Sequence, residues 1–163
     1  MAKREFKPQY DVEMLGNNPF VSSLKIPVFT NVVGYHEKDG VLMPEEKEWD
    51  AEPYAKMFVS ADRRHIITGL SFRALQLWNW IMQTIEPGQD HIWINRTRAM
   101  QECRIKSVRT FTDALKELGR YGFIVSCMSV KNVYFINPEM GFRGSRVKKY
   151  PNNLDFRQKN KEE

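Results

Sequence analysis

The chain has 163 residues, which suits one ordinary domain with short appendages. Hydrophobic residues make up 42% and charged residues 28% of it, which excludes a disordered or fibrous chain. Its apolar runs are shorter than the ~18–20 residues of a membrane-spanning helix, and its charged first residues exclude a secretory signal. We therefore expect an intracellular globular protein that makes no contact with a membrane.

The net charge of +5 is distributed unevenly along the chain. Between Trp93 and Tyr121 seven basic residues stand against three acidic ones. Between Val41 and Asp62 six acidic residues stand against two basic ones. A concentrated basic region is typical of proteins that bind polyanions, although a modest excess of positive charge is also common in proteins that do not.

Residues 1–24 contain few periodic apolar positions and the turn-forming run from Gly16 to Pro19, so we predict an extended arm. Residues 25–67 predict an acidic, β-rich segment with strand candidates at Val28–Val33, Val41–Met43 and Lys56–Val59. The first two candidates flank Lys38-Asp39-Gly40, which is typical of a tight hairpin turn.

Residues 68–144 are the most regular part of the chain and predict a single domain. Ser71 is expected to cap a first helix that ends at Pro87-Gly88. Its apolar positions at helical spacing are Phe72, Leu75, Trp78 or Asn79, and Met82. A short strand at His91–Ile94 follows, and then a second helix that Asn95 caps and that runs through Cys103.

After a turn at Arg104 to Lys106, Ser107 is expected to cap a third helix that Gly119 and Gly122 bring to an end. Its apolar face comprises Val108, Phe111, Ala114 or Leu115, and Leu118. The apolar runs Phe123–Met128 and Val133–Ile136 then predict a β-hairpin. This order of elements predicts an α+β fold of the winged helix-turn-helix class between about Leu70 and Pro138.

The third helix would supply the polar surface that reads a DNA major groove, because Phe111, Leu115 and Leu118 turn inward and its polar residues turn outward. The residues predicted to face the groove are Ser107, Arg109, Thr110, Asp113 and Lys116. The residues predicted to hold backbone phosphates are Arg96, Arg98, Arg104, Lys106 and Lys131. Arg109 would either fork onto a guanine edge or clamp a phosphate. In an isolated helix such a face is usually a solvated surface, and it is the ordered pattern that favours binding of double-stranded DNA.

Residues 145–163 form a basic C-terminal tail. Two interpretations stay open at this point. A flexible basic tail would add affinity for DNA without sequence information, and a solubilising tail would not bind at all.

We expect no enzymatic activity, no cofactor and no metal. The three histidines His36, His65 and His91 lie in separate segments without ligand spacing, and the carboxylates from Glu45 to Asp50 alternate with Lys47 as in a solvated loop. The sequence contains no glycine-rich phosphate loop. Cys103 and Cys127 lack CxxC spacing and are expected to be buried free thiols.

The stretch from Ser107 to Leu118, the Gly-Phe-Ile at 122–124, the run Tyr134-Phe135-Ile136-Asn137-Pro138 and Gly144 together resemble RepL-type plasmid replication proteins. Tyr54 to Phe58, leading into Leu70-Ser71, is similar to the strand before the first helix in that family. The resemblance covers Tyr54 to Gly144. It implies a DNA-binding protein of a plasmid or phage that acts in the bacterial cytoplasm, binding an origin so that the host polymerase does the chemistry.

The turn at Arg104 to Lys106 departs from this pattern, because it looks about a residue longer and has Arg104 where glycine is common. Residues before Asp62 are also not clearly part of it. An alternative therefore stays open: a structural component of a virion or other large assembly, built on a winged-helix scaffold. Its arm and tail would then contact neighbouring structural proteins, and a homo-oligomer is possible under either hypothesis.

Overall fold

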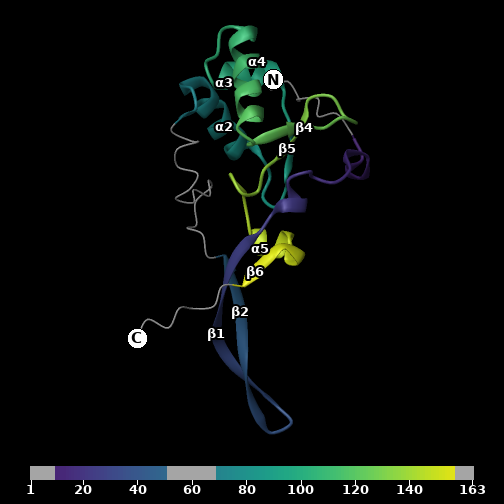
Figure 1. Cartoon of the computed structure of the whole chain (residues 1–163), viewed down its shortest axis with the longest axis vertical. Helices are drawn as coiled ribbons and strands as arrows, with labels where there is room; N and C mark the ends of the chain where they lie inside the picture. Colours follow the sequence, from purple (N-terminus) through teal and green to yellow (C-terminus); the bar gives the residue numbers. More distant parts are fainter. Residues whose placement is uncertain (1–9, 51–68, 157–163) are drawn as a thin grey trace, which may run out of the picture.

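The computed structural model describes residues 10–50 and 69–156 of the chain. In this part the fold is α+β, with four α-helices and two separate three-stranded sheets, which confirms the α+β class predicted from the sequence. Figure 1 shows the helices α2, α3 and α4 gathered at one end of an elongated molecule. The hairpin of β1 and β2 projects from the other end.

Three helices form the main core, and each begins after the residue that the sequence predicts as its cap. Helices α2 (Phe72–Thr84), α3 (Arg96–Glu102) and α4 (Val108–Arg120) follow Ser71, Asn95 and Ser107. Each of these three side chains accepts a hydrogen bond from a main-chain N–H in the first turn of its helix. The core between the helices includes the fully buried ring of Trp78, which packs edge-on against Phe123 with centroids 4.9 Å apart.

The buried face of α2 differs from the predicted one at its first residue. Phe72 is 68% exposed and lies beside the guanidinium of Arg73, whereas Ala74 and Leu77 are completely buried. Phe72 precedes Ala74 by two residues, which at 3.6 residues per turn places the two side chains on roughly opposite sides of the helix. The prediction that Phe72 belongs to the core is therefore wrong, while Trp78 is buried as predicted.

The turn between α3 and α4 uses a left-handed residue. Arg104 has φ 53°, its N–H donates to the carbonyl of Gln101 at 3.1 Å, and the N–H of Ile105 donates to the carbonyl of Met100 at 2.8 Å. This is the Schellman arrangement, in which the left-handed position normally carries glycine. The buried Ile105 packs beneath the turn, so the longer connection seen in the sequence is a regular helix ending.

Strands β3 (His91–Trp93), β4 (Ile124–Ser126) and β5 (Val133–Ile136) form an antiparallel sheet in the order β3-β5-β4. This agrees with the predicted strand and hairpin. One face of the sheet joins the helical core through residues such as Ile92 and Ile136. The opposite face carries Val133 and Phe135, which are also buried.

The N-terminal segment covers this second face. It was predicted to be an extended arm, but its described part folds into two 3-10 helices, η1 (Val12–Leu15) and η2 (Val21–Ser23). Leu15 packs into a cluster with Cys127 and Phe135, and the thiol of Cys127 lies 3.6 Å from the Leu15 carbonyl. The prediction of an extended arm is wrong here because both faces of the sheet are apolar and the second one needs a cover.

The acidic segment forms a long antiparallel hairpin of β1 (Ile26–Lys38) and β2 (Val41–Asp50). Asp39 and Gly40, with φ of 54° and 76°, make the two-residue turn that the sequence predicts. The two predicted strands are therefore present but longer than expected. The third strand candidate, Lys56–Val59, lies outside the described residues.

The C-terminal segment returns to the body of the molecule. It forms α5 (Arg146–Lys149), the 3-10 helix η4 (Pro151–Asn153) and β6 (Leu154–Phe156), which pairs in parallel with the base of β1. Arg146 is 1% exposed and donates to the carbonyl of Pro138 at 3.0 Å. As far as Phe156, then, the predicted basic tail is folded, and Arg146 is part of its packing.

Gly144 lies at the start of the C-terminal segment, at a position that requires glycine. Its φ of +115° suits glycine, and a Cβ there would lie 3.2 Å from the main-chain nitrogen of Gly88. The N–H of Gly88 also donates to the Arg143 carbonyl at 2.6 Å. The two backbones thus touch at a point where a side chain would push them apart.

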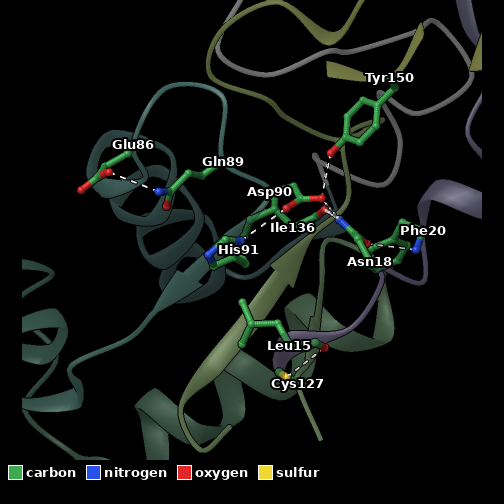
Figure 2. Close-up of polar contacts among 10 residues, drawn as sticks. All are labelled: Leu15, Asn18, Phe20, Glu86, Gln89, Asp90, His91, Cys127, Ile136 and Tyr150. Atoms are coloured by element: carbon green, nitrogen blue, oxygen red, sulfur yellow. Dashed lines mark hydrogen bonds and ion pairs between the residues drawn. The ribbon is translucent and has the colours of Figure 1, made fainter. Parts of the chain in front are cut away.

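Asp90 fastens the arm, the sheet and the C-terminal segment together (Figure 2). Its carboxylate accepts hydrogen bonds from the Asn18 amide at 3.1 Å and from the Tyr150 hydroxyl at 2.9 Å, and it lies 3.4 Å from the His91 ring nitrogen. Burial by itself would raise the pKa of Asp90, but the hydrogen bonds from His91, Asn18 and Tyr150 outweigh it and hold the pKa at about 2. Burial, together with this carboxylate, raises the pKa of Tyr150.

Candidate nucleic-acid interface

The exposed face of α4 carries a row of charged side chains. Phe111, Ala114 and Leu118 are buried against the core, and the residues on the opposite side of the helix are exposed. Arg109, Lys116 and Arg120 fall within ~40° of one another around the helix axis, because they are seven and four residues apart. The side chain of Arg109 is 93% exposed, so its guanidinium is open to a ligand.

Asp113 is the acidic member of this row. Its carboxylate lies 4.0 Å from the Arg109 guanidinium, and both side chains are largely exposed. An exposed pair of this kind contributes little to stability and is readily exchanged for another partner. Arg109 can therefore leave Asp113 for a phosphate or a base edge without a large cost.

A second carboxylate of α4, that of Glu117, points to α2 and not to the exposed row. Glu117 accepts hydrogen bonds from the main-chain N–H and the hydroxyl of Ser71, each at 2.6 Å. These bonds hold it at the N-terminus of α2, where the helix dipole favours a negative charge. They also bind α4 to α2 and fix the orientation of the exposed face relative to the core.

Helix α3 and the turn add further cations beside α4. Arg96, Arg104 and Lys106 are exposed. Arg98 differs, because its guanidinium donates to the carboxylate of Glu102 at 2.8 Å. The hydrogen bond from Arg98, with a second one from Trp80, lowers the pKa of Glu102. Glu102 therefore stays ionised, and Arg98 is paired with it on the surface of this helix.

The tip of the β4–β5 hairpin lies further along the chain. Lys131 is exposed there beside Asn132, whose φ of 64° makes the turn. Met128 in the same loop is fully exposed. The neighbouring Cys127 and Val130 pack against the arm and the sheet, so the loop is anchored at its base.

Apart from Arg98, which pairs with Glu102, the predicted site residues divide into three groups. Arg109, Asp113 and Lys116 lie together on the exposed face of α4, with Arg96, Arg104 and Lys106 on the preceding helix and turn. Ser107 and Thr110 are occupied in the helix cap, where the Ser107 hydroxyl accepts from the Thr110 N–H, and Thr110 is half-buried. Lys131 lies on a separate hairpin. The DNA interface itself stays a prediction.

Sequence reasoning missed two residues of this face. Arg120 is exposed on the same side as Arg109 and Lys116, and its spacing of four from Lys116 would have indicated it. Thr112 is exposed where Thr110 is not, although its hydroxyl bonds the Val108 carbonyl at 2.9 Å. Thr112 and Arg120 therefore belong to the exposed face of α4, and Thr110 lies at its flank.

Residues 10–50 and 69–156 also bear on two further classes of site, metal sites and membrane spans. Within these ranges no group of three or more His, Cys, Asp or Glu side chains is arranged to hold a metal ion. None of the helices described there is long and apolar enough to cross a membrane. Both cysteines are buried and free, as predicted, and burial raises the pKa of Cys103 to about 11.

These features define an α+β protein whose helical end presents a cationic surface on α3, the turn and α4. A family model described as Firmicute plasmid replication protein (RepL) matches residues 45–163. The chain belongs to this family, as the resemblance in the sequence indicated. The match also takes in the C-terminal segment, beyond the Gly144 at which the resemblance stopped. Comparisons with curated proteins and with solved structures gave no match.

Proposed function

We propose that residues 70–138 are a winged helix-turn-helix domain that binds double-stranded DNA, and that the protein initiates replication of a plasmid by binding its origin. The observation that carries the proposal is the row of exposed cations on α4, in a chain of the plasmid replication family. The order α2, β3, α3, α4, β4, β5 and the three-stranded antiparallel sheet support the domain class.

In this proposal α4 enters the major groove and α3 lies across the backbone. Arg109, in the first turn of α4, is the residue best placed to reach a base edge or a phosphate at the groove wall. Lys116 and Arg120 follow it along the same side of the helix and would contact phosphates. The hydrogen bonds from Ser71 to Glu117 keep a carboxylate from opposing the DNA on this side.

The turn residue Arg104 supports the same face. A non-glycine residue in the left-handed region costs about 1 kcal/mol, and glycine at the end of α3 would avoid that cost. An exposed cation kept at such a position is explained if its guanidinium binds a phosphate of the DNA backbone.

Lys131 would contact a phosphate in the neighbouring groove from the tip of the β4–β5 hairpin. Such a contact adds affinity and orientation without reading sequence. Because the loop is anchored at its base by Cys127, the hairpin would approach the DNA as a fixed wing.

The protein would act by binding alone, as a non-enzyme that needs no cofactor and leaves DNA synthesis to the polymerase of its bacterial host. The cytoplasm that holds the plasmid would be its place of action. Membership of the plasmid replication family favours this function and gives no support to a component of a virion.

Duplex binding measured by fluorescence anisotropy tests the proposal. The probe is a DNA duplex selected from a random pool by the full chain, titrated at two salt concentrations. We expect Arg109→Ala to lower affinity by about 5–150-fold and to reduce the salt dependence or the sequence preference. Lys25→Ala, which removes one exposed cation just before β1, is the matched control and should bind as the parent does.

Equal affinity of Arg109→Ala and the parent would show that α4 does not face the DNA. The initiation step has its own test. A plasmid whose replication depends on this gene should fail to establish with Arg109→Ala and should establish with Lys25→Ala. Retained DNA binding without any need for the protein in plasmid establishment would remove the initiator function and leave a DNA-binding regulator.

A further inference from the structure

The β1–β2 hairpin is a two-stranded ribbon with both faces exposed along its outer half. Large apolar side chains lie open on it: Val32 and Val33 are each 50% exposed, Tyr35 68% and Leu42 70%. An isolated two-stranded hairpin is at best marginally stable in water, and three or more strands are normally needed. Its length and exposed apolar surface therefore point to an additional strand from outside the described fold.

The two long edges of this ribbon are unequal. The outer edge of β2 contains Pro44, which has no N–H to offer, followed by the charged residues Glu45, Glu46, Lys47 and Glu48. Proline and charged side chains are the usual means by which proteins prevent an edge strand from pairing with another chain. The outer edge of β1 has a β-bulge between Val32 and Gly34, but from Gly34 to the turn its pairing with β2 is regular. Between Gly34 and His36 this edge has neither a proline nor an Asp, Glu, Lys or Arg.

The outer edge of β1 already accepts one strand at its base. Strand β6 pairs there with Ile26, Pro27 and Val28 and ends at Phe156. Beyond Val28, none of the other described strands pairs with this side of β1. The edge that continues toward the tip is therefore a pairing surface that is used at one end and open at the other.

The hydrogen-bonding direction of β1 can be read from its turn. In a two-residue hairpin the closing pair, here Lys38 and Val41, is hydrogen-bonded, and bonded and non-bonded pairs alternate from there. Tyr35 and Pro44 then form a non-bonded pair, which agrees with the missing N–H of proline. The main-chain N–H and C=O of Tyr35 consequently point to the open edge.

We propose that the outer edge of β1, from Gly34 to Lys38, pairs antiparallel with the same edge of a second copy of this chain, giving a homodimer with a continuous sheet through both hairpins. A second copy is the occupant that the charges favour. The run Val32–His36 carries no charge if His36 is neutral, and Glu37 and Lys38 are of opposite sign, so two copies meet without like-charge repulsion. DNA is disfavoured here, because the hairpin from Ile26 to Glu48 has five acidic residues and two lysines.

This dimer goes beyond the proposed binding of DNA and does not depend on it. Because α4 lies at the end of the molecule away from the hairpin (Figure 1), the dimer would carry its two helical ends far apart. It would then hold two separate duplex segments together instead of reading two half-sites one helical turn apart.

Sedimentation velocity on the full chain over a wide concentration range tests the proposal, with two variants of one residue. Tyr35→Pro and Tyr35→Thr both remove the exposed ring, but only proline removes the outward N–H. We expect the parent to dimerise, Tyr35→Thr to retain most of this tendency, and Tyr35→Pro to weaken dimerisation at least about 30-fold, because a two-fold interface loses each bond twice. Circular dichroism with thermal melting verifies that each variant is folded.

Every other result overturns the proposal. Equal loss in both variants would mean that the hairpins pack through side chains on their faces and not through the edge. A parent that stays monomeric at all concentrations would show that the outer edge of β1 does not bind a second copy. In that case removing residues 157–163, which follow β6, shows whether the chain's own last residues occupy the edge, since dimers would then appear in the shortened chain.

Discussion

The helical end and the hairpin end of this molecule differ in charge and in what holds them together. At the helical end, α2, α3 and α4 bury Trp78, Leu118 and their neighbours in one core and leave exposed cations on the outside. The β1–β2 hairpin is acidic, and away from its base its apolar side chains remain exposed. The helical end is therefore stabilised by its own buried core, whereas the outer hairpin depends on the pairing of its two strands and on any partner that binds it.

The largest expected contrast is in the cost of removing a leucine from each end. Leu118 is 0% exposed and Leu42 is 70% exposed. Leu118→Ala should lower the free energy of unfolding by about 2–5 kcal/mol through lost burial and a cavity, while Leu42→Ala should change it by less than about 0.5 kcal/mol. Urea denaturation measures both. Similar losses in the two variants would mean that the hairpin is packed as firmly as the helical core.

The junction between the two ends should be sensitive to acid. The pKa of Asp90 is lowered from 3.8 to about 2, so its carboxylate stabilises the fold above pH ~4, and this contribution is lost as the pH falls from ~4 toward ~2. After allowance for solvent screening, the loss is about 1–2 kcal/mol. Asp90→Asn should be less stable near neutral pH and should lack this acid transition.

Urea melts of the parent and Asp90→Asn between pH 2 and pH 7 measure the difference in unfolding free energy. Because Asp90 bonds Asn18 and Tyr150, the loss should be accompanied by loosening of the arm and the C-terminal segment, with α2 to α4 intact. Parallel pH dependences for the two proteins would show that this carboxylate does not fasten the junction.

The smallest expected effect sharpens the account of the cationic face. Arg104→Gly relieves a left-handed φ at a helix ending, and it should raise the free energy of unfolding by up to about 1 kcal/mol, less the extra chain entropy of glycine. The same variant should bind duplex more weakly and with a salt slope reduced by about 1. A variant that gains stability and keeps its full affinity would remove Arg104 from the proposed interface.

The helix caps and the hairpin turn were predictable because their signals are local. Ser71, Asn95 and Ser107 cap helices as expected, and Asp39-Gly40 makes its turn, since each needs only neighbouring residues to act. The exposed row on α4 followed from the spacing of its buried residues. Thr110 was wrongly included in this row, because spacing alone does not distinguish the half-buried flank of a helix from its exposed face.

The long-range contacts were not predictable in the same way. Nothing in the arm's own composition indicates that Asn18 bonds Asp90, 72 residues away. One signal was present, because β5 reads Val133-Tyr134-Phe135-Ile136 without a polar residue at alternate positions, which is typical of a strand buried on both faces. It predicts a cover for the sheet but does not identify the arm as that cover.

Hydrogen exchange with mass spectrometry, on the full chain with and without the selected duplex at one dilute protein concentration, tests the division between the two ends most directly. We predict slower exchange on DNA binding within residues 95–120, which contain α3 and α4, and no change within residues 26–38 of β1. Slower exchange in the hairpin, with α3 and α4 unaffected, would contradict the assignment of DNA binding to the helical end.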